Sequence, residues 1–231
     1  MTVCIAALYG DGQGAVLMSD QMITAHIPIG YEYEHAATTK IIAVDEAQST
    51  YALLAGDVLT GNEIVRLAKA ELLHKGGEAS APEIAEFVRQ AYQAVRLNFI
   101  VQTEMEARGL SLESFYDKHQ SLAPQVVQMV DQAMTQADIR VQLLVVGASG
   151  NTHTLHTIIN PGVITENTAI GHGALGSGAP HALAELIKDG YNASLARDDV
   201  LEMVQRAKTR SEVAPGVGPG TTTLVIPEDA A

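Results

Sequence analysis

The sequence of 231 residues is poor in basic residues and in aromatic residues. Lys and Arg total 14 against 27 Asp and Glu, which gives a net charge of -13. Partners such as nucleic acid or an anionic membrane surface require clustered basic side chains, so this balance argues against both. Tryptophan is absent and aromatic residues make up 4% of the chain, so aliphatic side chains must fill the core.

The chain also has little cysteine and no long hydrophobic run. Its single cysteine, Cys4, excludes an intrachain disulfide and suits a reducing cytoplasm. Cys4 lies inside an apolar segment, where we expect a buried side chain. No uncharged apolar stretch reaches the ~18 residues that cross a bilayer, and the N-terminus lacks the basic region of a signal peptide. We therefore expect a soluble cytoplasmic protein.

The first third of the sequence predicts β-strands. A glycine-rich turn, GDGQG, joins the first two apolar segments into a hairpin. Two more apolar segments follow without an intervening helix, which favours an antiparallel sheet over alternating strands and helices. The stretch between the two pairs contains Pro28, so we expect it to be irregular or to lie at a sheet edge. The four strand segments are 2–8, 15–20, 40–45 and 50–57.

Helices are predicted in the middle of the chain. Apolar residues follow a helical period over 59–74, and Gly76-Gly77 ends that helix. Ser80 and Glu83 form a capping box for a second helix, which runs to Arg108 and is stopped by Gly109. Further helical segments are expected within 111–119 and 122–136, with a break near Pro124.

Strands and helices alternate again after residue 140. Strands are predicted over 140–149, 152–159 and 221–227, with a strand and glycine loop over 163–178. Helices are predicted over 179–190 and 196–210, the second one capped by Ser194. This order indicates an α+β fold, a four-layer αββα sandwich of two stacked antiparallel sheets flanked by helices. There is no internal repeat or linker, so we expect a single domain over 1–231.

The second residue, Thr2, is the first candidate for chemistry. Removal of Met1 would leave Thr2 at a free N-terminus, where nucleophile and base occupy one residue. The hydroxyl could attack a carbonyl while the α-amino group, which titrates near roughly 7.7–8.0, accepts the proton.

Several ordered motifs resemble the β-type subunits of the proteasome, which are N-terminal-nucleophile hydrolases, and more loosely the related bacterial peptidase ring. The motifs are the initial TV, then VLMSD, TTKI, LLAGD, VQLLVVG and GSGAP. Together they span most of the chain and indicate a divergent bacterial or archaeal homologue.

The resemblance implies a role for each matched residue. Thr2 would be the nucleophile, Lys40 the active-site lysine, and Asp20 the carboxylate that holds Lys40 charged. The backbone N–H of Gly56 would stabilise the oxyanion, and Ser177 could relay a proton through water to the α-amine. Further residues are implied in substrate binding: Thr24 and Val58 would flank an extended peptide, and Ala25, Lys40, Leu54 and Val58 would shape its pocket.

The sequence departs from the family pattern in two places. The family usually carries an acidic residue near the end of the last helix, where it supports the serine and the N-terminus. Here that place holds Ser211 with Glu212 beside it, so either could take the supporting role. The segment at about 99–138 is longer than the family's helical pair, which commonly mediates contact between rings. We expect a homo-oligomer, as a ring or a related assembly, with a possible ATPase partner.

The leading hypothesis is a threonine peptidase or amidohydrolase that acts on a peptide or protein through an acyl-enzyme, with no cofactor and no metal. A peptide ligase or transamidase would use the same intermediate. A non-catalytic assembly subunit would retain Met1. A metal hydrolase would need His153, His156 and His172, but the first two are three residues apart on a strand and would face opposite sides.

Overall fold

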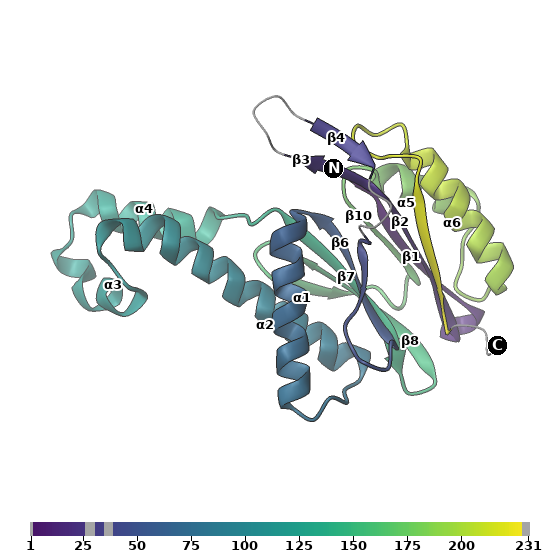
Figure 1. Ribbon diagram of the computed structural model, residues 1–231, viewed down its shortest axis with the longest axis horizontal. Coiled ribbons are helices and arrows are strands. Elements are labelled where there is room, and N and C mark those ends of the chain that lie inside the picture. The colour runs from purple at the N-terminus through teal and green to yellow at the C-terminus, as the bar shows by residue number, and fades with distance from the viewer. Residues whose placement is uncertain (1, 26–30, 35–38, 228–231) are drawn as a thin grey trace.

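Two antiparallel β-sheets lie face to face between two layers of helices in the computed structural model (Figure 1). The structure describes residues 2–25, 31–34 and 39–227. The order of layers is helices, sheet, sheet, helices, as predicted from the sequence. No helix within the described ranges is both long and apolar enough to cross a membrane.

The first sheet contains the N-terminal hairpin at its centre. Its strand order is β10-β1-β2-β11, and all three pairings are antiparallel. Helices α5 and α6 cover its outer face through an apolar cluster that includes Ile5, Val16, Leu186 and Val204. The elements are β1 (Cys4–Tyr9), β2 (Gly14–Asp20), β10 (His172–Leu175), β11 (Thr221–Ile226), α5 (Ala179–Lys188) and α6 (Arg197–Ser211).

The second sheet has the order β5-β6-β7-β8-β9. Helices α1 and α2 cover its outer face, where Ile64, Val88 and Tyr92 pack on Leu143. The elements are β5 (Ile41–Ala43), β6 (Thr50–Gly56), β7 (Val141–Ser149), β8 (Thr152–Ile159), β9 (Val163–Glu166), α1 (Val58–His74) and α2 (Ala81–Ile100).

The four early strands are divided between the two sheets, contrary to the expectation of one antiparallel sheet. A separate hairpin, β3 (Met22–Ala25) with β4 (Tyr31–Glu34), lies between β2 and β5 in the sequence. The free edge of β2 is occupied by β11 from the far end of the chain, which leaves β5 and β6 to pair with β7. Pro28 lies outside the described residues.

The inner faces of the two sheets pack against each other through apolar side chains. Cys4, Ala6 and Leu8 of β1 meet Leu53 and Ala55 of β6, all of them 3% exposed or less. Small side chains on β1 allow the sheets to approach closely, and the Cys4 thiol donates a hydrogen bond to the Leu54 carbonyl at 3.1 Å.

Helix capping confirms one prediction and corrects another. The Glu83 carboxylate accepts from the Ser80 backbone N–H at 2.8 Å, which completes the capping box of α2. Ser194 does not cap α6. The N-cap residue is Ala196, and Ser194 instead bonds the Asn192 side chain in the preceding turn.

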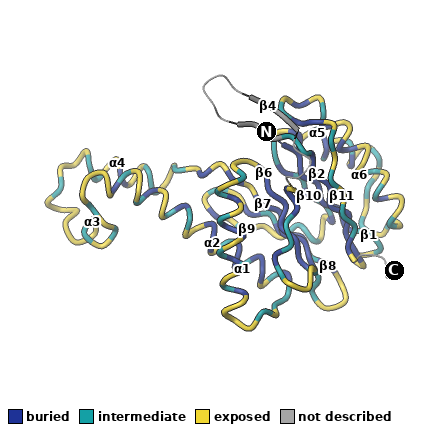
Figure 2. Tube along the Cα trace, in the orientation of Figure 1, coloured by how far each residue is buried: buried dark blue, intermediate teal, exposed yellow. Residues whose placement is uncertain are grey.

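A helical arm extends from the body beyond the end of α2 (Figure 1). The helix continues as a π-helical turn (Val101–Met105) and a 3-10 turn (Glu106–Arg108), and Gly109 stops it in the left-handed conformation, as predicted. The return path contains α3 (Leu112–Lys118), a 3-10 turn (His119–Ser121) and α4 (Pro124–Gln136). Met105, Phe115 and Val130 form a small core of the arm, whose surface is otherwise largely exposed (Figure 2).

Candidate active site

Thr2, Asp20 and Lys40 meet in a buried cluster beside the start of β1. Their exposed fractions are 3%, 0% and 3%. The Lys40 ammonium lies 2.6 Å from Asp20 Oδ1. The Thr2 hydroxyl donates to the same carboxylate oxygen and accepts from the Lys40 ammonium. One hydroxyl is therefore held between a cation and an anion, away from bulk water.

The Asp20 carboxylate is also bound by backbone donors. Its Oδ1 accepts from the Val3 N–H at 2.9 Å, and its Oδ2 accepts from Met22 at 3.1 Å and from Gly218 at 3.4 Å. A buried carboxylate is stable when its lone pairs are satisfied in this way. These bonds fix both Asp20 and the start of β1 relative to each other.

Strand pairing brings the three residues together from distant positions. Asp20 is the last residue of β2, where its backbone N–H donates to the Val3 carbonyl at 3.1 Å. Lys40 directly precedes β5, and its carbonyl accepts from Leu54 N–H of β6 at 2.9 Å. The lysine therefore reaches across from the second sheet to a carboxylate on the first.

Gly56 occupies a position that excludes any side chain. Its φ is +105°, and a Cβ there would lie 1.9 Å from the Arg140 carbonyl oxygen. This contact exists because β6 pairs with β7 up to Gly56 and Val141. The resulting close approach of two backbones leaves Gly56 on the wall beside Thr2, where its N–H could serve a developing negative charge.

The loop before α5 lies on the opposite side of Thr2. A Cβ at Gly176 would lie 2.2 Å from the Thr2 carbonyl oxygen, so glycine is required for this approach. That carbonyl accepts from Gly178 N–H at 3.2 Å. The Ser177 hydroxyl lies 3.4 Å from the Thr2 carbonyl oxygen and 3.3 Å from that of Pro215, so its proton can be donated to either.

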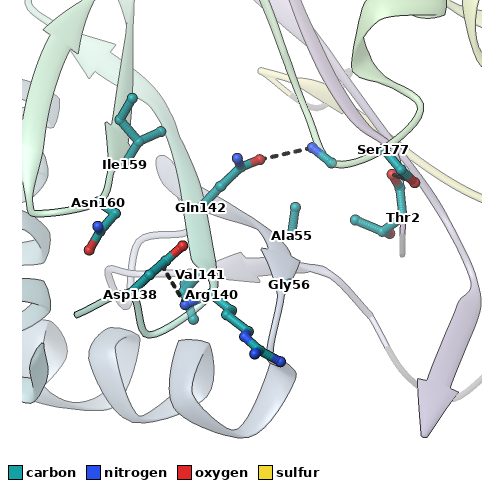
Figure 3. Close-up of a pocket in the computed structure, with 11 residues that line it drawn as sticks. Thr2, Ala55, Gly56, Asp138, Arg140, Val141, Gln142, Ile159, Asn160 and Ser177 are labelled. Carbon is teal, nitrogen blue, oxygen red and sulfur yellow. Dashed lines mark hydrogen bonds between the residues drawn. The ribbon is translucent and has the colours of Figure 1, made fainter. Parts of the chain in front are cut away.

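A cavity of about 600 Å³ opens beside Thr2 (Figure 3). Thr2, Gly56 and Ser177 line it near the cluster, and mostly polar residues line its far side. Gln142 Oε1 accepts from Gly176 N–H at 3.0 Å and so joins the two walls. The far side is formed by Asp138, Arg140, Gln142, Ile159 and Asn160.

The far wall was not indicated by the sequence. Asp138 and Arg140 come at the end of the arm, and they reach the cavity because β7 begins next to Gly56. Arg140 has a φ of +56° and its N–H donates to Asp138 Oδ1 at 2.7 Å. A bulky residue such as Arg140 rarely adopts the left-handed conformation, so its backbone marks this position as unusual. The backbone angle cannot be read from the sequence.

The residues predicted to bind substrate lie in different environments. The Leu54 side chain is 2% exposed and packs under α1 against Gly61, away from the cavity. Val58 is the first residue of α1 and is half-buried. Thr24 and Ala25 belong to β3, but their side chains lie outside the described part of the structure, as does Met1.

Among the described residues, the side chains of Ser211 and Glu212 form hydrogen bonds with groups other than Thr2 and Ser177. The Ser211 hydroxyl donates to the Ala207 carbonyl at 2.7 Å and so turns back into its own helix. Glu212 pairs with Lys208 at 2.6 Å. Lys208, in the last turn of α6, is 2% exposed.

The histidines of β8 face opposite sides of their strand, as predicted. His153 bonds the Gly12 carbonyl, and His156 bonds the Thr154 hydroxyl. Burial lowers the pKa of both imidazoles. Across residues 2–25, 31–34 and 39–227, no three His, Cys, Asp or Glu side chains are placed to hold a metal ion.

Cys4 lies on β1 close to the cluster, but its thiol is not activated as a nucleophile. Burial raises the pKa of its thiol to about 12, which outweighs the opposing effect of the nearby Lys40 cation. A thiol with this pKa remains protonated and unreactive at neutral pH.

Comparison with known proteins supports the fold. No family model and no curated protein matches the sequence. Among solved structures, the chain is similar to a Gly-1 mutant of Anbu from Hyphomicrobium sp. strain MC1, with a TM-score of 0.66 and 12% sequence identity. The match covers 96% of this chain and 80% of the Anbu chain. At this identity the likeness establishes a shared αββα architecture.

Proposed function

We propose that the protein is a proteasome-like threonine hydrolase that cleaves peptide or amide bonds with Thr2 as its nucleophile, once Met1 has been removed. The observation that carries the proposal is the Thr2 hydroxyl, which is bound by both Asp20 and Lys40 at the edge of a cavity. The αββα fold that the chain shares with Anbu is compatible with this proposal.

The cluster suits formation of an acyl-enzyme. Thr2 Oγ1 forms a bond to the substrate carbonyl carbon while its proton passes to the α-amine of the same residue. The Lys40 ammonium already contacts Oγ1 and would stabilise the negative charge that develops there, and Asp20 would keep the ammonium in place. The Gly56 N–H would donate to the oxyanion.

Collapse of this intermediate breaks the carbon–nitrogen bond. The proton held by the α-amine passes to the departing amine, and the acyl group remains as an ester on Thr2. A water molecule then attacks the ester, which releases the acid and regenerates the hydroxyl. If an amine took the place of water, the enzyme would be a ligase or transamidase instead.

Intact-mass measurement with a peptide epoxyketone, an electrophile directed at N-terminal threonine, tests the proposal. The purified protein should lack one methionine and gain the mass of one inhibitor. Thr2→Ala should abolish labelling and Thr2→Ser should retain some of it, whereas Thr135→Ala, on the exposed face of α4, should label normally. Retention of Met1 together with no labelling would overturn the proposal. The remaining hypothesis would then be a non-catalytic assembly subunit.

Products formed with a competing amine separate the two acyl-transfer reactions. An N-acylated amine in excess of free acid would indicate ligation. Free acid alone would indicate hydrolysis.

A further inference from the structure

The loop 213–220, between α6 and β11, closes over the Thr2 cluster from the side of the first sheet. The Gly218 N–H donates to Asp20 Oδ2 at 3.4 Å, and the Pro215 carbonyl accepts from the Ser177 hydroxyl at 3.3 Å. The loop therefore contacts two residues of the proposed active site. Its sequence, VAPGVGPG, supplies no polar side chain that could hold it in place.

A buried lysine on α6 supplies that anchor. The Lys208 ammonium is bonded to the Gly218 carbonyl at 2.8 Å, to the Pro219 carbonyl at 2.6 Å and to Glu212 Oε1 at 2.6 Å. Three acceptors use the full donor capacity of an ammonium group. The Glu212 carboxylate offsets the charge, so a lysine that is 2% exposed is stable at this site.

Gly218 joins this anchor to the proposed active site within a single residue. Its carbonyl accepts from Lys208 and its N–H donates to Asp20. Asp20 in turn contacts Lys40 and the Thr2 hydroxyl. A shift of the Gly218 backbone would therefore move a donor away from the carboxylate that orients the nucleophile.

We propose that Lys208 is a positioning residue that holds loop 213–220 against Asp20 and Ser177, and that it does so in place of a direct contact from Ser211 or Glu212. This inference rests on the proposed function. Lys208 is bonded to Glu212, Gly218 and Pro219 and is not among the residues that line the cavity, so its effect on the reaction passes through the loop.

Inactivation kinetics with a peptide epoxyketone test the role. Lys208→Met removes the three hydrogen bonds and leaves two carbonyls without their donor. The first-order inactivation rate at saturating inhibitor should fall by about 10- to 100-fold, because small displacements of reacting groups have effects of this size. The concentration that gives half-saturation should change little, since the cavity wall is unaltered.

One matched control and two graded variants accompany Lys208→Met. Lys188→Met removes a lysine of α5 that pairs with Glu185 and is 70% exposed, and its inactivation rate should equal that of the wild type. Glu212→Gln keeps an oxygen acceptor for the ammonium but removes the charge that offsets it, so it should lose less of the rate than Lys208→Met. Lys208→Arg keeps the cation and its donors, and should recover part of the rate lost in Lys208→Met.

Each outcome bears on a different claim. A first-order rate depends on correctly folded molecules alone, so a wild-type rate in Lys208→Met would show that Lys208 has a purely structural role and would overturn the inference. If Lys208→Met does not fold, the inactivation rates of Lys208→Arg and Glu212→Gln are compared with their melting temperatures. Rates that fall in step with melting temperature, and not with the loss of donors to the Gly218 carbonyl, would also overturn the inference. A wild-type protein that is not labelled at all would instead overturn the proposed function.

Discussion

The Asp20–Lys40 pair offers a quantitative test of how the cluster is stabilised. Asp20→Asn would leave an ammonium that is 3% exposed without an ion-pair partner among the described residues, because the amide oxygen can accept its hydrogen bond but carries no charge. Loss of one member of a buried pair costs about 3–5 kcal/mol of unfolding free energy. The loss of unfolding free energy in Lys40→Met should lie near the lower end of that range, because the Asp20 carboxylate still accepts hydrogen bonds from the N–H groups of Val3 and Met22.

The double variant distinguishes an ion pair from two independent residues. If the two charges compensate each other, Asp20→Asn with Lys40→Met should be less destabilised than the sum of the single variants by about 2–3 kcal/mol. Urea unfolding at a fixed protein concentration measures all four forms through their midpoints and slopes.

The same cycle on an exposed pair gives the reference. Lys75→Met with Glu71→Gln, whose side chains are 53% and 45% exposed, should show a coupling of about 0–1 kcal/mol, as solvent-exposed pairs do. Additivity within about 0.5 kcal/mol at Asp20 and Lys40 would refute the reasoning, because it would mean that neither charge depends on the other for its burial.

Further predictions concern the backbone, the thiol and pH. Gly56→Ala should lower the unfolding free energy by about 2–5 kcal/mol and abolish epoxyketone labelling, since its Cβ would overlap the Arg140 carbonyl at a positive φ; an unchanged urea midpoint would contradict this. Cys4 should resist maleimide at neutral pH and react once urea unfolds the chain, and rapid modification of the native protein would show that the thiol is accessible. The unfolding free energy should decrease as the pH falls below about 6.5. Burial lowers the pKa of His153 in the native state, so over this range the unfolded chain binds a proton that the folded chain binds only at lower pH. His153→Gln should flatten this slope, which otherwise reaches up to about 1.4 kcal/mol per pH unit for each proton, and an unchanged slope in His153→Gln would contradict this assignment.

Local patterns in the sequence predicted the elements well. The glycine turn between β1 and β2, the capping box at Ser80 and the stop at Gly109 each depend on neighbouring residues, so the sequence contains the whole signal. The division of the early strands between two sheets depends on β11, which lies some two hundred residues away, and no local pattern reports that pairing. Ser194 failed as a cap because the intervening turn placed the helix start two residues later.

The same distinction applies to the candidate site. Thr2, Asp20 and Lys40 were selected by their place in ordered motifs, and the structure brings their side chains together. The far wall of the cavity could not be predicted, since Arg140 and Gln142 follow an arm whose path is set by tertiary packing. Lys208 was missed because a basic residue in the last turn of a helix is usually solvated. Ring assembly, an ATPase partner and the roles of Thr24 and Ala25 remain predictions.

The arm and the body are built on separate cores that have no residue in common among those described. Their main connection is α2, and Arg96 closes the base of the arm by donating to the carbonyls of Met134 and Ala137. Such an appendage can open as its own cooperative unit, with amide hydrogens that exchange while those of the sheets stay protected. Changes in length or sequence at the tip of the arm can therefore accumulate without disturbing Thr2. We expect this surface to diverge in sequence faster than the residues around Thr2.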